Sequence, residues 1–193
     1  MGHSLKKTEW QSPQDYLEME MASPERHEYV DGEVFAMTGT SRPHNVIAGN
    51  LYMLLRNELR GKGCRAYFAD IKLRIEAANC YFYPDLMVTC TEADRLSQHV
   101  MNEPVLVVEV LSPSTALYDR DRKFAAYRRL SSLREYVLVD TERMGIECFR
   151  RTDHGEWILH PYGAGESVTL HSLALTFPLE AAYEDAGLPA DSE

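Results

Sequence analysis

Cysteine is scarce in this chain, and its spacing excludes several classes of protein. The 193 residues contain four cysteines, with no CxxC pair among them. Structural zinc sites usually pair their thiolates at such short spacings, and small secreted scaffolds need a higher density of cysteine. We therefore expect Cys64, Cys80, Cys90 and Cys148 to be reduced residues of the core or surface, in a protein from a reducing compartment.

Long apolar runs are also missing, and positive charge is in the minority. No stretch approaches the roughly 18 apolar residues of a membrane span, and the first residues carry no apolar signal segment. We expect a soluble, cytoplasmic protein with no membrane partner. Lys and Arg number 20 against 30 Asp and Glu, a formal charge of −10. This balance excludes a broadly basic surface, so any surface that binds nucleic acid must be local.

The length and composition favour one domain. Hydrophobic residues make up 45% of the chain, enough for a sizeable core, and no internal repeat or linker interrupts it. We expect the domain to cover residues 12–184, after an N-terminal extension of residues 1–11. Residues 185–193 are small and acidic, and we expect them to form a disordered tail.

The pattern of apolar residues predicts alternating helices and strands. Ser12-Pro13 is typical of a helix start, and apolar residues recur at helical spacing after His44. Helices are expected at 12–21, 44–59 and 119–130, and strands at 65–76, 81–90, 105–111, 133–140, 145–151 and 156–162, with a hairpin turn at Asp31-Gly32. The helix before strand 133–140 makes that strand parallel to 105–111. We predict an α/β fold of mixed α+β character, with helices flanking a central mixed sheet and extra strands near the C-terminus.

Two acidic residues lie in or beside strands that should be buried. Asp85 precedes Leu86-Met87-Val88, and Glu109 lies in the apolar segment Val105–Leu111. A carboxylate in such a strand is unfavourable to bury unless a metal ion or a lysine faces it. Taken alone, Asp85 could be a turn residue bonded to the backbone, and Glu109 could pair with a buried arginine. Together the two acids predict a metal site.

These segments carry a resemblance to a known family. Pro84-Asp85, then Glu109-Val110-Leu111 on the next strand, resembles the PD-(D/E)XK nuclease superfamily. Within it, the chain is similar to the Uma-type putative restriction endonuclease family over residues 12–180. The segments that carry this likeness are Tyr29-Val30-Asp31-Gly32-Glu33, His44, Tyr83-Pro84-Asp85, Val108 to Thr115, and Tyr118-Asp119 with Lys123 and Tyr127. The resemblance implies a restriction-endonuclease-like αβββαβ core.

The lysine of the superfamily pattern is displaced in this chain. The pattern has a lysine two residues after the second acid, where this sequence has Leu111. The resemblance implies that the lysine has moved to the following helix, as Lys123. Lys123 and Tyr127 are four residues apart and therefore share a helical face, which places Tyr127 at the margin of the site. A solvated charge at the start of a mixed-charge helix remains the plainer interpretation of Lys123.

The resemblance also implies a reaction. Mg²⁺, or Mn²⁺, held by Asp85, Glu109 and the backbone carbonyl of Val110 would stabilise charge on a phosphoryl group and make water nucleophilic. Lys123 would orient that water, stabilise the developing charge, or act as the base if its pKa were depressed.

Further residues are assigned to the surroundings of this site. Glu33 is a candidate second acidic ligand. His44 could contact phosphate or transfer a proton, or it could be an ordinary residue of a helix start. Asp70 could line the cleft or bond only to backbone groups. A local basic strip that could contact nucleic acid consists of Arg120, Arg122, Arg128 and Arg129.

We therefore predict a metal-dependent endonuclease that hydrolyses phosphodiester bonds in DNA and, by analogy, acts as a homodimer. Two alternatives stay open. If Lys123 does not reach the acids, the chain could be a weak or inactive nucleic-acid-binding or assembly module that retains the nuclease fold. It could also be a ribonuclease, because no motif for stacking or groove recognition identifies the nucleic acid. Cleavage that depends on a divalent metal would separate these hypotheses.

Overall fold

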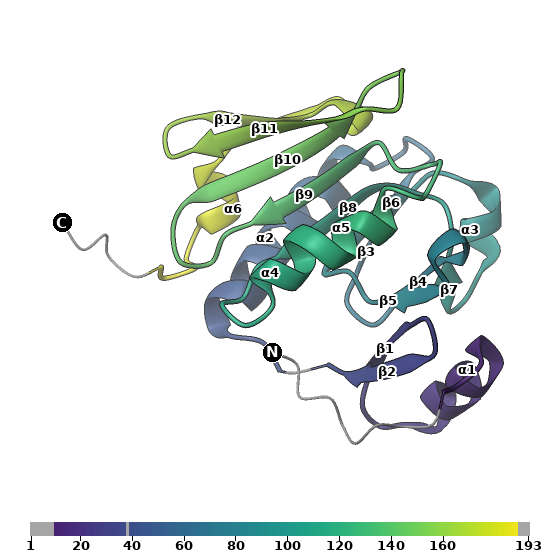
Figure 1. Cartoon of the computed structure of the whole chain (residues 1–193). Coiled ribbons are helices and arrows are strands. Elements are labelled where there is room, and N and C mark those ends of the chain that lie inside the picture. The colour runs from purple at the N-terminus through teal and green to yellow at the C-terminus, as the bar shows by residue number, and fades with distance from the viewer. Residues whose placement is uncertain (1–9, 38, 189–193) are drawn as a thin grey trace.

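The computed structural model describes residues 10–37 and 39–188, which form two main β-sheets (Figure 1). The larger sheet has six strands in the order β11-β10-β9-β8-β6-β3. These strands are β3 (Arg65–Phe68), β6 (Leu86–Thr89), β8 (Pro104–Val110), β9 (Glu135–Val139), β10 (Gly145–Arg151) and β11 (Trp157–Gly163). β8 and β9 run parallel, and the other neighbours run antiparallel. The predicted mixed sheet is thus confirmed.

The second sheet has five strands in the order β2-β1-β5-β4-β7. Its strands are β1 (His27–Val30), β2 (Glu33–Ala36), β4 (Lys72–Ile75), β5 (Cys80–Phe82) and β7 (Val100–Met101). The predicted hairpin at Asp31-Gly32 joins β1 to β2, and both turn residues have a positive φ, as a tight two-residue turn requires. A further hairpin pairs β12 (Ser167–Leu170) with β13 (Leu175–Pro178). The hairpin of β12 and β13 was not predicted from the sequence, although its apolar residues alternate.

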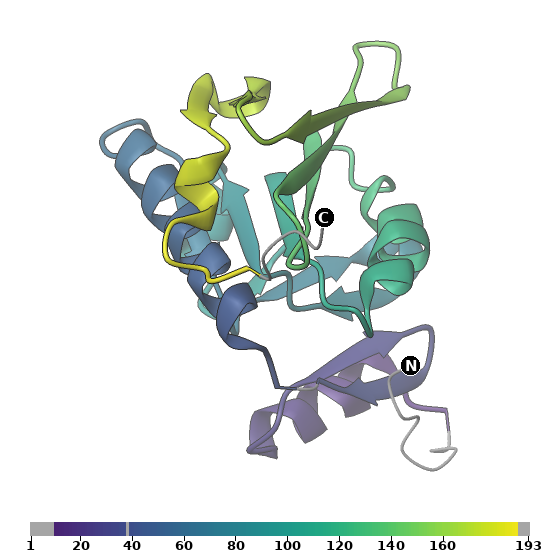
Figure 2. The same cartoon turned by 90° about the vertical axis from the view of Figure 1, so that its left-hand side faces the viewer.

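Helices cover both faces of the six-stranded sheet (Figure 2). The helices are α1 (Pro13–Ala22), α2 (Arg42–Glu58), α3 (Glu92–Leu96), α4 (Ala116–Tyr118), the π-helical segment η2 (Asp119–Lys123), α5 (Phe124–Tyr127) and α6 (Glu180–Tyr183), with 3-10 turns η1 (Glu76–Ala78) and η3 (His171–Leu173). Ser12 caps α1 in a capping box with Asp15. Among the described residues, no helix is long and apolar enough to cross a membrane.

Two apolar clusters define the layers. On one face of the six-stranded sheet, Leu51 and Leu55 of α2 pack with Val88 and Val108. On the other face, the helical run from α4 to α5 lies between the two sheets, and its Tyr127 packs in a cluster that draws on both of them. Side chains on this second face therefore lie close to residues of the smaller sheet.

The two long strands predicted at 65–76 and 81–90 are each broken, which corrects the sequence analysis. Ala69 and Asp70 have positive φ values and turn the chain between β3 and β4. Pro84 follows β5 and has no N–H to donate to a ladder. Each half therefore joins a different sheet, and Asp85 lies at the corner between them.

The expectation of four reduced cysteines is wrong for Cys64 and Cys90, which form a disulfide. Arg65 pairs with Thr89 across β3 and β6, so the next residues outward lie opposite each other. Their separation of 26 positions conceals this pairing in the sequence. Cys80 and Cys148 are free and buried.

The chain is packed beyond the expected start of its acidic tail. Ala186 is fully buried and Leu188 packs against the cluster on the α2 face, so the tail expected from residue 185 does not hold for residues 185–188. Residues 189–193 lie outside the described residues. Of the expected extension at residues 1–11, Gln11 is bonded to Gly32 and Tyr29, and residues 1–9 again lie outside the described part.

Candidate active site

The register of β6 and β8 brings the two predicted acids together. Leu86, the first residue of β6, lies opposite Val108 of β8, so Asp85, the bend residue just before β6, reaches the end of β8 that carries Glu109 and Val110. The Asp85 charge acts on Glu109, which shows that the two carboxylates lie close together. The Val110 N–H donates a 2.7 Å hydrogen bond to Asp85 Oδ2, which fixes that carboxylate against β8.

Lys123 lies beside this acid pair, and Tyr127 shares its partner. Lys123 Nζ is 3.2 Å from Glu109 Oε1, and the Tyr127 hydroxyl donates a 2.7 Å hydrogen bond to the same oxygen. Both side chains extend from the helical run over the sheet, one turn apart. Leu111, which occupies the superfamily's lysine position, is buried in the apolar cluster around Tyr127.

Two further carboxylates, neither of them chosen from the sequence, surround the same lysine. Lys123 Nζ is 2.9 Å from Glu28 Oε1 and 3.4 Å from Asp119 Oδ1. Glu28 is buried on β1, whereas Glu33, the acid predicted from this hairpin, is exposed at the start of β2. The sequence contains little signal for Glu28, because it lies between His27 and Tyr29 and not within an apolar run as Glu109 does.

Three carboxylates therefore share one ammonium group. This arrangement and the burial of the cluster shift the pKa values of its members. Burial acts to lower the pKa of Lys123, but Glu109, Glu28 and Asp119 raise it well above its ordinary value of 10.5. Burial raises the pKa of Glu109 well above 4.5, and Asp119 and Asp85 add to this while Lys123 opposes it. Burial likewise raises the pKa of Asp119. The lysine is therefore held in its charged form, whereas burial disfavours the charged forms of Glu109 and Asp119.

His44 contacts the other side of Asp85. Ser41 caps α2, and its side chain accepts the His44 N–H, so the imidazole sits in the first turn of the helix. His44 Nε2 is 3.3 Å from Asp85 Oδ2. Burial acts to lower the pKa of His44, but the Asp85 carboxylate and the Val110 backbone outweigh it and raise the pKa above 6.5. His44 is thus held in place by Asp85 and Val110, two of the residues predicted to bind the metal ion.

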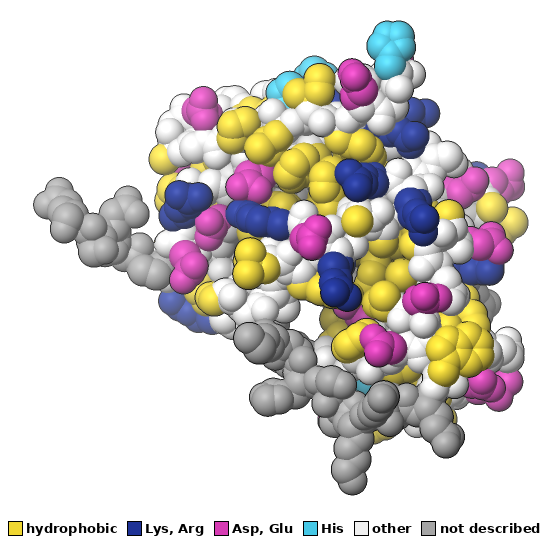
Figure 3. Space-filling view, in the orientation of Figure 1, with side chains coloured by type: hydrophobic (Ala, Val, Ile, Leu, Met, Phe, Trp, Pro, Cys, Tyr) yellow, Lys and Arg dark blue, Asp and Glu magenta, His cyan; other side chains and the backbone are white. Residues whose placement is uncertain are grey.

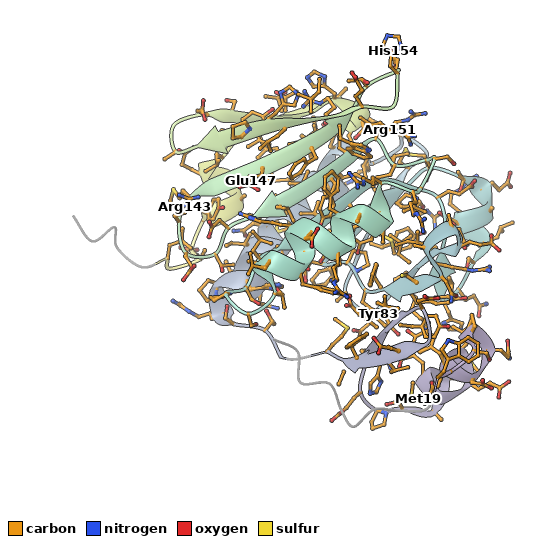
Figure 4. All side chains as sticks on the ribbon, viewed as in Figure 1. Met19, Tyr83, Arg143, Glu147, Arg151 and His154 are labelled. Carbon is orange, nitrogen blue, oxygen red and sulfur yellow. A yellow bond between two sulfur atoms is a disulfide. The ribbon has the colours of Figure 1, made fainter. Side chains whose placement is uncertain are left out.

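A second buried network anchors the segment that precedes Asp85. The Tyr83 hydroxyl donates a 2.7 Å hydrogen bond to Glu20 Oε1 of α1 and accepts one of 3.1 Å from Lys72. Figure 4 shows Tyr83 between the N-terminal hairpin and the strands above it. Because Tyr83 is two residues from Asp85, this network fixes the chain on the N-terminal side of the site.

The remaining predicted residues lie in different surroundings. Asp70 is exposed in the bend after β3. Arg120 donates to Glu147, Arg129 donates to the Ala77 carbonyl, Arg128 lies over the Phe124 ring, and Arg122 is exposed. On the face in Figure 3, basic side chains alternate with acidic and hydrophobic ones over the helical run and β10. Three of the four arginines therefore have protein partners.

The acid pair has oxygens to offer a hard cation. Within residues 10–37 and 39–188, no hydrogen bond reaches Asp85 Oδ1 or Glu109 Oε2. The same described residues contain no group of three or more His, Cys, Asp or Glu side chains arranged to hold a metal ion. Mg²⁺ is commonly held by one or two carboxylates together with water and substrate oxygens, so the pair fits such an ion.

The fold matches that of a solved structure, and the sequence matches a family model. A crystal structure described as a putative nuclease belonging to DUF820, from Anabaena variabilis, superimposes with a TM-score of 0.74, covering 90% of this chain and 98% of that one at 14% identity. The chain matches the model of the Uma2 family, putative restriction endonucleases, over residues 13–182. It therefore belongs to that family.

Two Synechocystis proteins are similar in sequence. The uncharacterized protein slr1290 is 40% identical over 172 residues, covering 89% of this chain and 90% of the relative. The uncharacterized protein sll1609 is 34% identical over 147 residues, covering 75% of this chain and 83% of the relative. Both relatives match through most of their length.

Proposed function

We propose that this protein is a divalent-metal-dependent endonuclease that hydrolyses phosphodiester bonds in DNA. One observation carries the proposal above the others. Asp85, just before β6, lies beside the end of β8 that carries Glu109, each acid has one oxygen that no described residue binds, and a buried lysine contacts Glu109. Membership of a family of putative restriction endonucleases supports nuclease chemistry at this position.

In this proposal some residues of the site bind the ion and another acts on the substrate. Asp85, Glu109 and the Val110 carbonyl would hold Mg²⁺ or Mn²⁺, which when bound supplies charge neutralisation and a more acidic water. Lys123, kept charged by its carboxylate neighbours, would stabilise negative charge on the phosphoryl group. A lysine held in this state is poorly suited to accept a proton.

His44 is the group placed to touch substrate on the other side of Asp85. It lies in the first turn of α2, where the helix dipole favours an anion. We propose that His44 contacts a phosphate or transfers a proton. Cutting both strands of DNA needs two such sites, so we also propose a homodimer.

Nicking of supercoiled plasmid tests the proposal. The wild-type protein should nick with Mg²⁺ or Mn²⁺, should stop when EDTA is added, and should be suppressed by Ca²⁺, whose larger and looser shell does not hold the same geometry. Asp85→Asn should be inactive, whereas Asp153→Asn, an exposed aspartate in the β10–β11 hairpin, should match the wild type.

The alternatives give different results. Undiminished cleavage in excess EDTA would remove the mechanism. Binding of DNA without any cleavage, under every divalent ion tried, would favour the inactive binding module. Cleavage of single-stranded RNA with DNA left intact would make the protein a ribonuclease.

A further inference from the structure

Glu28 makes the shortest contact of Lys123 with a carboxylate, although it belongs to a different sheet. Its Oε1 lies 2.9 Å from Nζ, against 3.2 Å for Glu109 and 3.4 Å for Asp119. The Glu28 side chain is only 11% exposed and that of Lys123 only 9%. Water therefore screens this contact little, so the attraction between the two charges exceeds that of a surface pair, although its geometry is that of an ion pair and not of a hydrogen bond.

The alternation of β1 directs Glu28 at the helical run. Tyr29, the next residue, packs on the opposite face of its sheet with Tyr16 and Tyr81. Successive side chains of a strand point to opposite faces, so Glu28 points away from α1 and toward Lys123. The contact thus joins the N-terminal hairpin to the helix that carries the lysine.

The three carboxylates around Lys123 differ in their position in the fold and in their other roles. Asp119 lies one turn before Lys123 on the same helical run, and Glu109 has a role at the acid pair. Glu28 has neither constraint, and it approaches from the other sheet. From the same sheet, the Phe82 ring of β5 lies 5.6 Å from Nζ, so Glu28 is the carboxylate on that side of the ammonium. A lysine stem has four rotatable bonds, so an ammonium that loses its charged partner on one side can move away from its position.

We propose that Glu28 is a positioning residue that fixes the Lys123 ammonium beside Glu109. The catalytic consequence rests on the proposed nuclease function, but the positioning itself does not. Glu28 acts through the lysine and does not hold the ion. Its loss should therefore change turnover and the environment of Lys123 without changing the affinity for a metal.

Two measurements on the full chain test this role. First, acylation of lysines by an N-hydroxysuccinimide ester, followed by peptide mass spectrometry, reports access to Lys123 without any substrate. Glu28→Gln should raise the acylation rate of Lys123 several-fold and leave Lys62, which is exposed in both proteins, unchanged. Glu25→Gln, an exposed glutamate just before β1, is the matched control and should behave as the wild type.

Second, the variants are compared in plasmid nicking and in Mn²⁺ titration by calorimetry. Glu28→Gln should lower kcat by about 10–100-fold, the usual range for a supporting residue, with KM and the Mn²⁺ dissociation constant unchanged. Glu28→Asp keeps the charge but is shorter, so its kcat should lie between the two. A purely structural role would lower the melting temperature and leave the kcat of the folded fraction intact.

Several outcomes would overturn the inference. Unchanged acylation of Lys123 in Glu28→Gln would show that Glu28 does not fix the lysine. Weaker Mn²⁺ binding would make Glu28 a ligand, and a higher kcat would make it an inhibitory contact. If the wild-type protein cleaves nothing, the proposed function fails and the catalytic consequence fails with it, while the acylation rates still decide whether Glu28 positions Lys123.

Discussion

Glu109 and Glu135 are both buried glutamates on the adjacent strands β8 and β9, yet their surroundings are opposite. Glu135 is fully buried and accepts hydrogen bonds from Arg150 Nε at 2.9 Å, from the His171 N–H at 3.0 Å and from the Ser172 N–H at 2.8 Å. Burial acts to raise the pKa of Glu135, but the bonds from Ser172, Arg150 and His171 outweigh it and lower the pKa below 4.5.

Within the described part of the chain, Glu109 contacts one cation, Lys123, and shares it with Glu28 and Asp119. Its Oε1 accepts from Lys123 and Tyr127, and the pKa of Glu109 is raised well above 4.5 by burial and by neighbouring acids. Burial alone therefore does not mark a functional carboxylate. A satisfied carboxylate holds the fold together, and one short of positive charge is suited to bind a cation.

Glu109→Ala gives the largest expected effect on activity. Cleavage should fall by at least about 10²-fold, because a carboxylate proposed to hold the divalent ion is lost. Stability should rise or stay level, because removing one of three acids around Lys123 relieves repulsion. Plasmid nicking and urea unfolding check the two halves. Loss of cooperative unfolding would instead identify Glu109 as a structural ion-pair partner.

Glu135→Ala should have the converse effect. The unfolding free energy should drop by about 3–5 kcal/mol, because the Arg150 charge and buried N–H groups lose their acceptor. Nicking per folded molecule should stay intact. Glu147→Ala is the control, since Glu147 is half-buried and pairs with Arg120, and should cost only about 0–1 kcal/mol. An equal loss of unfolding free energy in Glu135→Ala and Glu147→Ala would contradict the structural role of Glu135.

Lys123→Met tests the role of the ammonium group that contacts Glu109. Turnover should fall by about 10²-fold, with Mn²⁺ affinity nearly unchanged. Lys123→Arg should not restore it, because a planar guanidinium cannot occupy the compact site between the carboxylates. Lys62→Met, in the exposed turn after α2, serves as the control. Near wild-type turnover in Lys123→Met would reduce Lys123 to a structural charge.

The pH dependence of stability should separate the two glutamates by sign. The pKa of Glu109 is raised in the folded state, so its contribution is present below pH 4.5 and is lost as the pH rises through the folded-state value. The pKa of Glu135 is lowered, so its contribution is present above pH 4.5 and is lost as the pH falls through its folded-state value.

Glu→Gln variants at each position make that contrast measurable in chelator. The destabilisation by Glu135→Gln should be greatest near neutral pH and shrink below 4.5. Glu109→Gln should become progressively more favourable relative to the wild type as the pH rises above 4.5. Urea unfolding at several pH values gives both curves, and slopes of the same sign would refute the comparison.

The sequence was most informative where chemistry and local pattern agree. Asp85 and Glu109 could be selected because carboxylates are unusual in apolar strands, and the hairpin at Asp31-Gly32 followed from local turn chemistry. The αβββαβ order, including the parallel pair of β8 and β9, also followed from local patterns.

The remainder depends on contacts between distant segments. Glu33 was chosen because it lies in a segment that carries the family resemblance. Glu28 was missed because only packing against the helical run decides which acid of this hairpin is buried. The disulfide between Cys64 and Cys90 depends on the register of β3 and β6. The breaks near Asp70 and Pro84 depend on the competition between two sheets, which periodicity within one strand does not reveal.

A crystal structure of the protein soaked in Mn²⁺ tests the central claim most directly. The account predicts an anomalous peak about 2 Å from Asp85 Oδ1 and Glu109 Oε2, with the Lys123 ammonium still beside Glu109 Oε1. A peak elsewhere, or none between these two carboxylates at a concentration of Mn²⁺ that supports nicking, would contradict it.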